Sequence, residues 1–210
     1  MTKLLVIMAH PHTETTGKSV QVAQTFMTQY QQNHPEDEIV VRDLFTTSVP
    51  PLNDETFDAW LKVKYGKTLN SDEETLLAAH SDWLEEFVSA DKYVFVNPMY
   101  NHFLPAELKS YIDVTAVTRK TFKYTANGPV GLLTGKKALH IQAAGGLYHD
   151  PEHPNAQADL GDSYLDMILN LYGIKDTNKI FIEGCDQMPE QTATILAAAN
   201  DEATQLAKTF

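Results

Sequence analysis

The sequence is poor in cysteine and arginine, and it has no long apolar run. Cys185 is the single cysteine of the 210 residues, which excludes an intrachain disulfide and a cysteine-based zinc cluster. The longest early apolar run, residues 4–9, is too short for the core of a signal peptide and far too short to span a bilayer. We therefore expect a soluble, cytoplasmic protein.

Positive charge is also scarce. The chain has 16 Lys and Arg residues against 28 Asp and Glu, which gives a formal net charge of −12 at pH 7. Phosphate backbones and anionic lipids attract basic surfaces, so this balance argues against a nucleic-acid binder and against a membrane-docking protein. The 43% share of hydrophobic residues suffices for a sizeable core, and no internal repeat is present. The length favours one domain over residues 1–210.

Apolar runs alternate with amphipathic stretches along the chain. Short continuous apolar runs are typical of strands buried on both faces, and apolar positions three or four residues apart are typical of helices. Their alternation predicts an α/β fold, a doubly wound five-stranded parallel sheet with helices on both faces. We favour the flavodoxin-like strand order 2-1-3-4-5. The expected strands are 4–9, 39–44, 93–96, 139–142 and 180–182, and the expected helices are 18–33, 72–90, 104–117, 160–171 and 189–208, with an irregular segment at 44–70 that contains a short helix near 54–65.

The loop after the first strand, residues 10–19, leads into a helix. Ligands of such sheets bind beyond the carboxyl ends of the strands, and a helix N-terminus attracts anions. Thr16, Gly17, Lys18 and Ser19 add hydroxyls, close backbone approach and a positive charge, so we expect a phosphate group here. The alternative is that Thr16 or Ser19 merely caps the helix.

A nucleotide-binding enzyme with a P-loop is a further alternative for this loop. Gly17-Lys18-Ser19 fits the end of a P-loop, but His12 stands where its first glycine belongs. Arginines that stabilise phosphoryl transfer are also scarce, since the chain has only Arg42 and Arg119. We therefore favour a phosphorylated ligand over phosphoryl-transfer chemistry.

The loops after the third and fourth strands belong to the same sheet edge. Pro98 takes the chain out of the sheet, and the residues that follow offer a thioether, an aromatic ring and an amide. Paired glycines after the fourth strand let a ligand approach the backbone, although an ordinary turn would also use them. Together the loops suit a flat polar heterocycle. The residues concerned are Pro98, Met99, Tyr100, Asn101 and His102 in the first of these loops and Ala143, Ala144, Gly145 and Gly146 in the second.

At these residues the sequence resembles the FMN-dependent NADH-azoreductase family, which consists of flavodoxin-like quinone and azo-dye reductases. The resemblance extends over nearly the whole chain, and His10-Pro11 is similar to the eukaryotic-type quinone reductases. The motifs that carry it are Pro98-Met99-Tyr100-Asn101, Leu108-Lys109-Ser110-Tyr111-Ile112-Asp113, Thr121-Phe122-Lys123-Tyr124-Thr125-Ala126-Asn127-Gly128-Pro129, Gly131-Leu132 and Thr134-Gly135-Lys136-Lys137.

The resemblance implies FMN as cofactor, NADH as co-substrate, a quinone or azo acceptor and a homodimer with each active site at the subunit interface. The loop with His10, Thr16, Gly17, Lys18 and Ser19 would bind the FMN phosphate. The loop 98–102 would contact the flavin ring and ribityl chain, and the loop 143–146 the pyrimidine edge of the ring. No metal is implied.

Aromatic residues of a predicted hairpin, with its tip at Asn127-Gly128, are candidates for the acceptor pocket. Phe122 and Tyr124 would overhang the flavin there, although they also suit a hairpin face or the core. His102, Tyr124 and His149 are candidates for proton delivery. A metal site formed by His149 and His153 is disfavoured, because nearby prolines preclude the rigid helix that usually presents such a pair.

These features predict an FMN-dependent oxidoreductase that transfers electrons from NADH to quinones or azo compounds by a ping-pong mechanism. The scarcity of arginine favours NADH, which lacks the 2′-phosphate of NADPH. The alternative from another class is a flavodoxin-like electron carrier without an NADH site. A hairpin over the ring favours the enzyme, because a carrier keeps its flavin edge open to protein partners.

Overall fold

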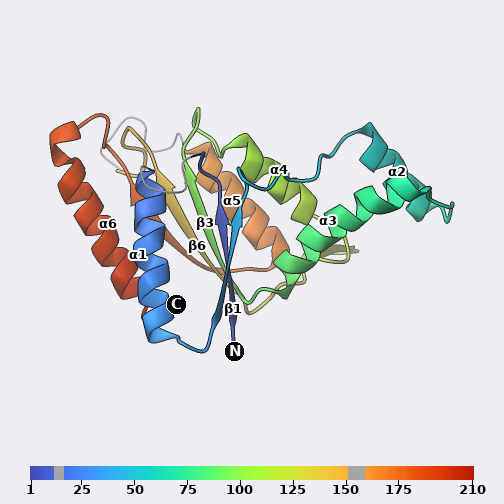
Figure 1. Cartoon of the computed structure of the whole chain (residues 1–210), viewed down its shortest axis with the longest axis horizontal. Helices are drawn as coiled ribbons and strands as arrows, with labels where there is room; N and C mark the ends of the chain where they lie inside the picture. The colour runs from blue at the N-terminus through green and yellow to red at the C-terminus, as the bar shows by residue number, and fades with distance from the viewer. Residues whose placement is uncertain (12–16, 151–158) are drawn as a thin grey trace.

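Five parallel strands form the central sheet in a computed structural model, which describes residues 1–11, 17–150 and 159–210 (Figure 1). Each strand pairs in register with its neighbour, as in Val6 of β1, which lies beside Val41 on one side and Val94 on the other. The five parallel strands, numbered along the chain, follow the order 2-1-3-4-5, so the predicted topology is confirmed. Across the sheet they are β2 (Glu38–Asp43), β1 (Lys3–Met8), β3 (Lys92–Pro98), β6 (Lys137–Ala143) and β7 (Asp176–Ile182).

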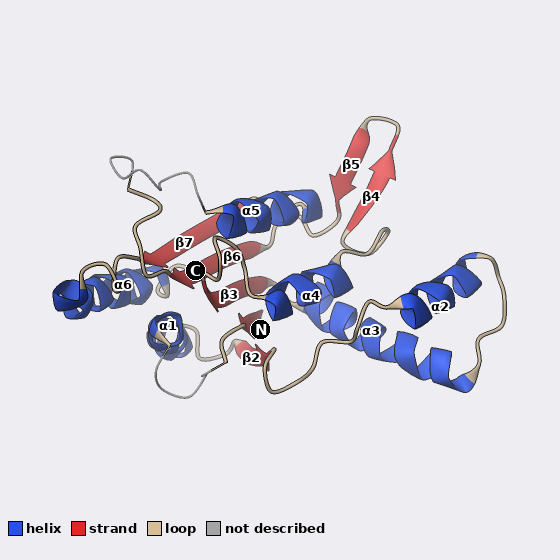
Figure 2. Cartoon of the chain, turned by 90° about the horizontal axis from the view of Figure 1, so that it is seen from above, coloured by secondary structure: helices blue, strands red, loops and turns tan. Residues whose placement is uncertain are grey.

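Helices cover both faces of the sheet (Figure 2). One face packs against α1 (Lys18–Asn33) and α6 (Thr192–Leu206), which follows a short 3-10 helix, Pro189–Gln191. The other face packs against α3 (Ser71–Ser89), α4 (Ala106–Thr115) and α5 (Leu160–Tyr172). Side chains of a strand point alternately to the two faces, so β1 and β3 supply both cores and read as continuous apolar runs.

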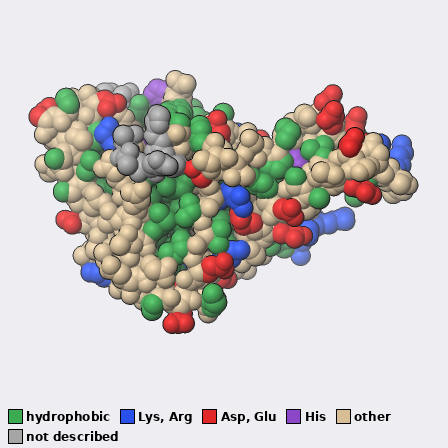
Figure 3. Space-filling model, viewed as in Figure 1, with side chains coloured by type: hydrophobic (Ala, Val, Ile, Leu, Met, Phe, Trp, Pro, Cys, Tyr) green, Lys and Arg blue, Asp and Glu red, His purple; other side chains and the backbone are tan. Residues whose placement is uncertain are grey.

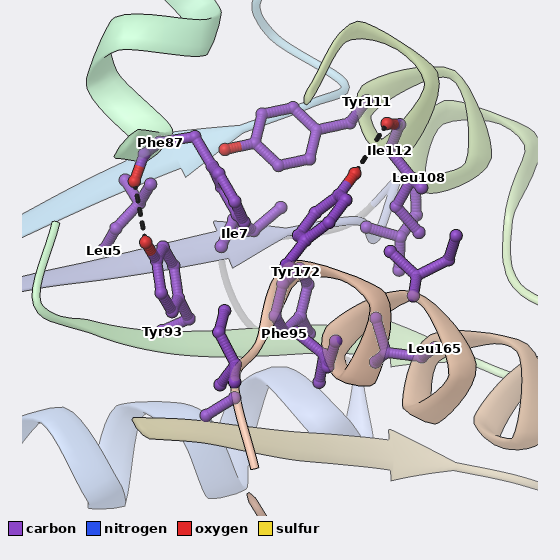
Figure 4. Close-up of a cluster of buried hydrophobic side chains, with 14 of the residues drawn as sticks. Leu5, Ile7, Phe87, Tyr93, Phe95, Leu108, Tyr111, Ile112, Leu165 and Tyr172 are labelled. Atoms are coloured by element: carbon purple, nitrogen blue, oxygen red, sulfur yellow. Dashed lines mark hydrogen bonds between the residues drawn. The ribbon is translucent and has the colours of Figure 1, made fainter. Parts of the chain in front are cut away.

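Aromatic side chains dominate the core beneath α3, α4 and α5 (Figure 4). The Tyr93 hydroxyl donates to the carbonyl oxygen of Phe87 at 2.9 Å, and the Tyr172 hydroxyl to that of Ile112 at 3.4 Å. Both rings are fully buried, and burial raises the pKa of each hydroxyl. These bonds satisfy hydroxyl and carbonyl groups whose burial without partners would destabilise the fold. The first bond ties α3 to β3, and the second ties α4 to α5.

The second strand is less buried than its apolar run suggests. β2 lies at the edge of the sheet and pairs only with β1, and Val41 is 50% exposed. The expected irregular segment contains a helix, α2 (Asp54–Lys64), as predicted. With the first half of α3 it forms an arm that projects from the body, and acidic side chains gather on that arm (Figures 1 and 3).

The predicted hairpin exists, formed by β4 (Phe122–Thr125) and β5 (Gly128–Gly131). Its two-residue loop is Ala126-Asn127, one residue earlier than expected, and Gly128 has the positive φ of 106°. The hairpin is anchored at the C-terminal end of α5, where the Leu133 amide donates to the Tyr172 carbonyl oxygen at 2.8 Å. This attachment determines where the hairpin aromatics lie.

Replacing Gly131 by Ala is expected to lower the free energy of unfolding by about 1–3 kcal/mol, the usual cost of overpacking. A Cβ at Gly131 would overlap backbone atoms of Tyr172 and Gly173, which cannot rotate away as a side chain can. Denaturant unfolding measures the change. Val130→Ala is the control, because Val130 is 45% exposed on the same strand and its truncation should matter by less than about 0.5 kcal/mol. Equal stability of the two variants would contradict the close approach.

Candidate active site

A cleft of about 230 Å³ opens at the carboxyl edge of the sheet, where the loops after β1, β3 and β6 meet. The three loops singled out from the sequence therefore come together, and a fourth, after β7, joins them. The Met99 amide donates to the Ala143 carbonyl oxygen at 2.7 Å and links two of the loops. The cleft is lined by His10, Gly17, Lys18, Pro98, Met99, Tyr100, Ala143, Ala144, Gly145 and Asp186.

The first turn of α1 faces this cleft with its amides uncapped by any described side chain. Gly17 is the N-cap residue, and Ser19 lies inside the helix. The Ser19 hydroxyl is fully buried and has no hydrogen-bond partner among the described residues. The alternative that Ser19 caps the helix is therefore wrong. Thr16 and His12 lie outside the described residues.

Lys18 and His10 lie beside the start of the helix. The Lys18 ammonium lies 3.5 Å from the carboxylate of Asp186, which is largely exposed. The His10 ring lies against Gly17 so closely that a Cβ there would be 2.5 Å from His10 Nε2. Glycine is thus needed at position 17 for the ring to lie across the helix start. Uncapped amides at a helix N-terminus and an ammonium group are features that attract anions.

A tight turn follows β3. Tyr100 and Phe103 exchange amide-to-carbonyl hydrogen bonds of 2.9 and 3.0 Å, so the central residues are Asn101 and His102. Both have positive φ, 52° and 62°, a conformation that residues other than glycine seldom adopt. Neither residue is among those that line the cleft. The His102 ring is exposed and stands edge-to-face with Tyr148, with ring centroids 5.5 Å apart.

The two glycines after β6 have different surroundings. A Cβ at Gly145 would lie 2.5 Å from the Asp186 carboxylate, whereas one at Gly146 would meet the Tyr148 ring at 3.4 Å, an ordinary contact. Gly145 lines the cleft and Gly146 is not among its lining residues. The Gly145 carbonyl oxygen accepts hydrogen bonds from the amides of Asp186 and Gln187, at 3.1 and 3.2 Å. The loop after β7 is thereby held against the cleft.

Asp186 is the lining residue that the sequence reasoning missed. Site residues were expected only in the loops after the first, third and fourth parallel strands, but β7 ends at the same edge of the sheet. An aspartate also does not indicate a phosphate site, because its carboxylate repels a phosphate group. The sequence feature that could have pointed to Asp186 is its position in the turn that follows an apolar strand.

The hairpin aromatics do not reach this cleft within one chain. Phe122 is 7% exposed and belongs to the core, whereas Tyr124 is 72% exposed. The hairpin lies at the C-terminal end of α5 (Figure 2), whereas the Leu160 amide at the other end of α5 donates to the carbonyl oxygen of His102, in the turn after β3, at 3.1 Å. The 13 residues of α5 extend about 20 Å. Neither Phe122 nor Tyr124 of the same chain is among the residues that line the cleft.

His149, in the loop after β6, lies between two carboxylates. Its Nδ1 lies 2.7 Å from Glu183, its Nε2 lies 3.7 Å from Asp159, and its ring stacks on Phe181 at 3.6 Å between centroids. His153, the other histidine of the disfavoured metal pair, lies outside the described residues. Among the residues that are described, no group of three or more His, Cys, Asp or Glu side chains is arranged so that it could hold a metal ion.

Comparisons with known proteins agree with the fold. A family model described as a flavodoxin-like fold matches residues 2–207. Over its full length the chain is 60% identical to FMN-dependent NADH:quinone oxidoreductase 2 of Lactiplantibacillus plantarum, and all of that protein is covered. The chain belongs to the flavodoxin-like family of FMN-dependent NADH:quinone oxidoreductases.

Other members of this family and their solved structures are also similar over whole chains. The chain is 50% identical to FMN-dependent NADH:quinone oxidoreductase 1 of Lactococcus lactis, with both proteins fully covered. An azoreductase from Bacillus anthracis superposes with a TM-score of 0.92 at 32% identity, again over both full chains. An FMN-dependent NADH-azoreductase from the same species, solved in complex with FMN, superposes with a TM-score of 0.90 at 32% identity and covers 99% of this chain and 100% of that one.

Membership of this family confirms the resemblance and the enzyme class predicted from the motifs after β3 and before β6. In the described parts of the chain, no helix combines the length and the apolar character needed to cross a membrane.

Proposed function

We propose that the protein binds FMN in the cleft at the carboxyl edge of the sheet, oxidises NADH and reduces quinones or azo compounds. The observation that carries this proposal is the anion site at the start of α1. There Gly17 and Lys18 line one end of the cleft, the amides of the first helical turn have no side-chain cap in the described parts of the chain, and the next residue, Ser19, carries a buried hydroxyl without a partner among the described residues. A helix N-terminus of this kind suits a phosphate group.

The lining residues fit the rest of an FMN molecule. Ser19, Lys18 and the first amides of α1 would hold the phosphate, as the lone hydroxyl indicates. Pro98, Met99 and Tyr100 offer an apolar wall for a flat ring system. Ala143, Ala144 and Gly145 leave open the backbone that a heterocycle edge can approach. The names of the relatives, which specify FMN and NADH, support the same assignment.

The chain's own residues would bind FMN, orient it and exclude water from the cleft. When bound, FMN supplies the hydride acceptance from NADH and the electron transfer to the acceptor, so no side chain must act as an obligatory acid or base. Proton delivery by His102, His149 or Tyr124 stays a prediction. Of these, His149 is the most rigidly placed, because its Nδ1 contacts the Glu183 carboxylate and its ring stacks on Phe181.

We propose NADH rather than NADPH as the reductant. Arg42 donates two hydrogen bonds to the Glu86 carboxylate, at 2.8 and 2.5 Å, and is therefore engaged in an ion pair. Arg119 lies at the base of the hairpin, where its amide bonds the Phe122 carbonyl oxygen. Neither arginine lines the cleft, so neither is placed to recognise a 2′-phosphate. A cytoplasmic location stays a prediction.

Steady-state turnover distinguishes the enzyme from an electron carrier. The FMN-loaded protein is expected to oxidise NADH when a small quinone is present, and removal of FMN is expected to lower that rate by at least about 1,000-fold, because the cofactor carries the chemistry. The rate should return when FMN is added to the FMN-free protein. An FMN-loaded protein that accepts electrons from a protein reductase but not from NADH would contradict the proposal and support the carrier.

We propose further that the protein is a C2 homodimer in which the hairpin of one chain lies over the cleft of the other. The distance between hairpin and cleft within one chain supports this arrangement. So do large apolar side chains that are more than half exposed on the arm and hairpin: Phe57, Val63, Tyr65 and Tyr124. A groove of about 740 Å³ between the arm and α4, lined in part by Trp60, Leu77, Leu84, Val114 and Val117, offers further apolar surface. Such surfaces are typical of subunit interfaces.

Mixed dimers test the exchange of hairpins. Tyr124→Ala is expected to change the preference between two quinones by about 10-fold and FMN affinity by less than about twofold, since the side chain meets the acceptor and not the cofactor. A dimer that pairs Tyr124→Ala with Lys18→Gln keeps one intact site, formed by the wild-type cleft of the first chain and the wild-type hairpin of the second. It should therefore regain the wild-type preference. Light scattering that gives the mass of one chain would contradict the dimer.

A further inference from the structure

Three polar side chains lie buried directly beneath the cleft. Asn97 of β3 and His140 and Gln142 of β6 point to the sheet face that packs against α5, and their exposed fractions are 0%, 3% and 1%. Asn97 precedes Pro98, and Gln142 precedes Ala143, both of which line the cleft. Polar groups this deeply buried are destabilising unless they are hydrogen-bonded, so each needs a partner.

The three side chains form one hydrogen-bonded row between two carboxylates of α5 and its cap. At one end, His140 Nδ1 lies 2.9 Å from Asp162 Oδ1. His140 Nε2 lies 3.0 Å from Asn97 Oδ1, and Asn97 Nδ2 donates to Gln142 Oε1 at 3.2 Å. At the other end, Gln142 Nε2 donates to Asp159 Oδ2 at 2.5 Å.

The carboxylate of Asp159 determines the direction of every bond in the row. Asp159 is the N-cap residue of α5, where it accepts the Asp162 amide at 2.8 Å and where the helix dipole favours its negative charge. An ionised carboxylate can only accept, so Gln142 must turn its NH₂ group toward it and its oxygen toward Asn97. Asn97 must then turn its own oxygen toward His140. Nε2 of His140 must therefore carry a proton.

The other ring nitrogen of His140 also faces an acceptor. Burial raises the pKa of Asp162, but hydrogen bonds from His140 and Lys179 outweigh it and leave that pKa below its ordinary value. Asp162 is thus ionised, with the Lys179 ammonium 2.6 Å from its second oxygen. Nδ1 of His140 must donate to the first oxygen. Both nitrogens of the ring therefore carry protons.

We propose that His140 is a buried imidazolium and that it acts as a positioning residue for the two cofactor loops after β3 and β6. Its position relative to FMN rests on the proposed function, whereas its protonation does not. The groups that face it are Asp162 from α5, Asn97 from β3 and the Phe181 ring from β7, whose centroid lies 6.1 Å away. The charged groups one step further are Lys179, which also pairs with Asp166, and Asp159 with His149.

Loss of one proton from His140 would reverse the row. A bare Nε2 would require the NH₂ group of Asn97, and Gln142 would then have to turn its oxygen toward Asp159, which could tolerate it only by taking up a proton. Asn97 Nδ2 would also leave the carbonyl oxygen of Pro98, to which it donates at 3.0 Å. Pro98 lines the cleft, so the charge on His140 keeps the cleft floor in one arrangement.

Nitrogen NMR of the histidine ring tests the protonation in the full-length protein, with and without FMN. The expected result is that both His140 ring nitrogens carry protons at neutral pH, as the acceptors on both sides of the ring require. A His140 ring with one unprotonated nitrogen at neutral pH would overturn the proposal. Because this measurement needs neither FMN nor a variant, it decides the protonation even if the proposed function fails.

Two matched variants of α5 test the positioning role. Asp162→Asn removes the carboxylate that holds Nδ1–H, whereas Asp166→Asn removes one that contacts Lys179 but not His140. We expect Asp162→Asn to remove the second proton from His140. We expect it also to weaken the binding of FMN and of riboflavin equally, by about 10-fold, because both flavins share the ring site that changes. We expect Asp166→Asn to keep the ring doubly protonated and both affinities within about twofold. Equal effects of the two variants, or wild-type flavin affinity in a singly protonated Asp162→Asn protein, would overturn the positioning role.

Discussion

Replacing Lys18 by Gln is expected to weaken FMN binding by about 10- to 150-fold and to leave riboflavin binding unchanged. Lys18 lies in the first turn of α1 and lines the cleft, and the next residue, Ser19, has a buried hydroxyl. A hydrogen bond to a charged group contributes about 1.5–3 kcal/mol, which corresponds to that range of affinities. Riboflavin has the same ring and ribityl chain but no phosphate, so it should not sense the ammonium group.

Fluorescence titration of FMN-free protein with each flavin measures both affinities. Lys208→Gln is the matched control, because Lys208 lies beyond the end of α6, where its ammonium group donates to the Gln205 side chain at 2.8 Å, and it should behave as wild type. Added salt should weaken FMN binding to the wild-type protein and affect riboflavin far less, since salt screens charges. Equal losses for the two flavins in Lys18→Gln would show that Lys18 supports the fold or the ring, and not the phosphate.

Double-reciprocal plots of NADH oxidation at several quinone concentrations are expected to be parallel. The cleft holds about 230 Å³, below the range of about 300–1,000 Å³ that is common for small-molecule sites. A flavin bound there would occupy it and leave one face of the ring open. Two planar rings cannot stack on one face together, so we expect nicotinamide and quinone to bind in turn. Excess quinone should then inhibit competitively against NADH.

Planar inhibitors provide a second reading of the same geometry. An inhibitor that stacks on the open face should compete with NADH and with the quinone alike. Intersecting double-reciprocal lines, together with an inhibitor that competes with only one substrate, would require two separate sites. The shared pocket would then be wrong, while the binding of FMN by the anion site would be unaffected.

Much of the fold was predictable from the sequence because the sheet buries its strands on both faces. The run 4–9 is apolar at every position for this reason, and β1 pairs on both sides. The predicted burial was wrong at β2, because a single apolar run does not reveal which strand lies at an edge. The tip of the hairpin was displaced by one residue, since Gly128 supplies the positive φ after a loop of Ala126 and Asn127.

The candidate site was predictable where one loop carries its own signal, and not where groups meet across loops. Gly17, Lys18 and Ser19 are consecutive, so their convergence needed no tertiary information. Asp186 reaches the cleft only because β7 ends at the same edge. The row beneath the cleft had a weaker signal, in that His140 and Gln142 alternate with apolar residues in a strand buried on both faces. Their partners on β3 and α5 could not be read from that pattern.

The most direct test of the central claim follows the two half-reactions separately, without oxygen, in the FMN-loaded protein. NADH alone is expected to remove the visible absorbance of the bound flavin, and a quinone added after the NADH is consumed is expected to restore it. Lys18→Gln at an FMN concentration that saturates only the wild-type protein should show both changes with a smaller amplitude, because less flavin is bound to the protein. A wild-type flavin absorbance that NADH leaves unchanged would contradict the account.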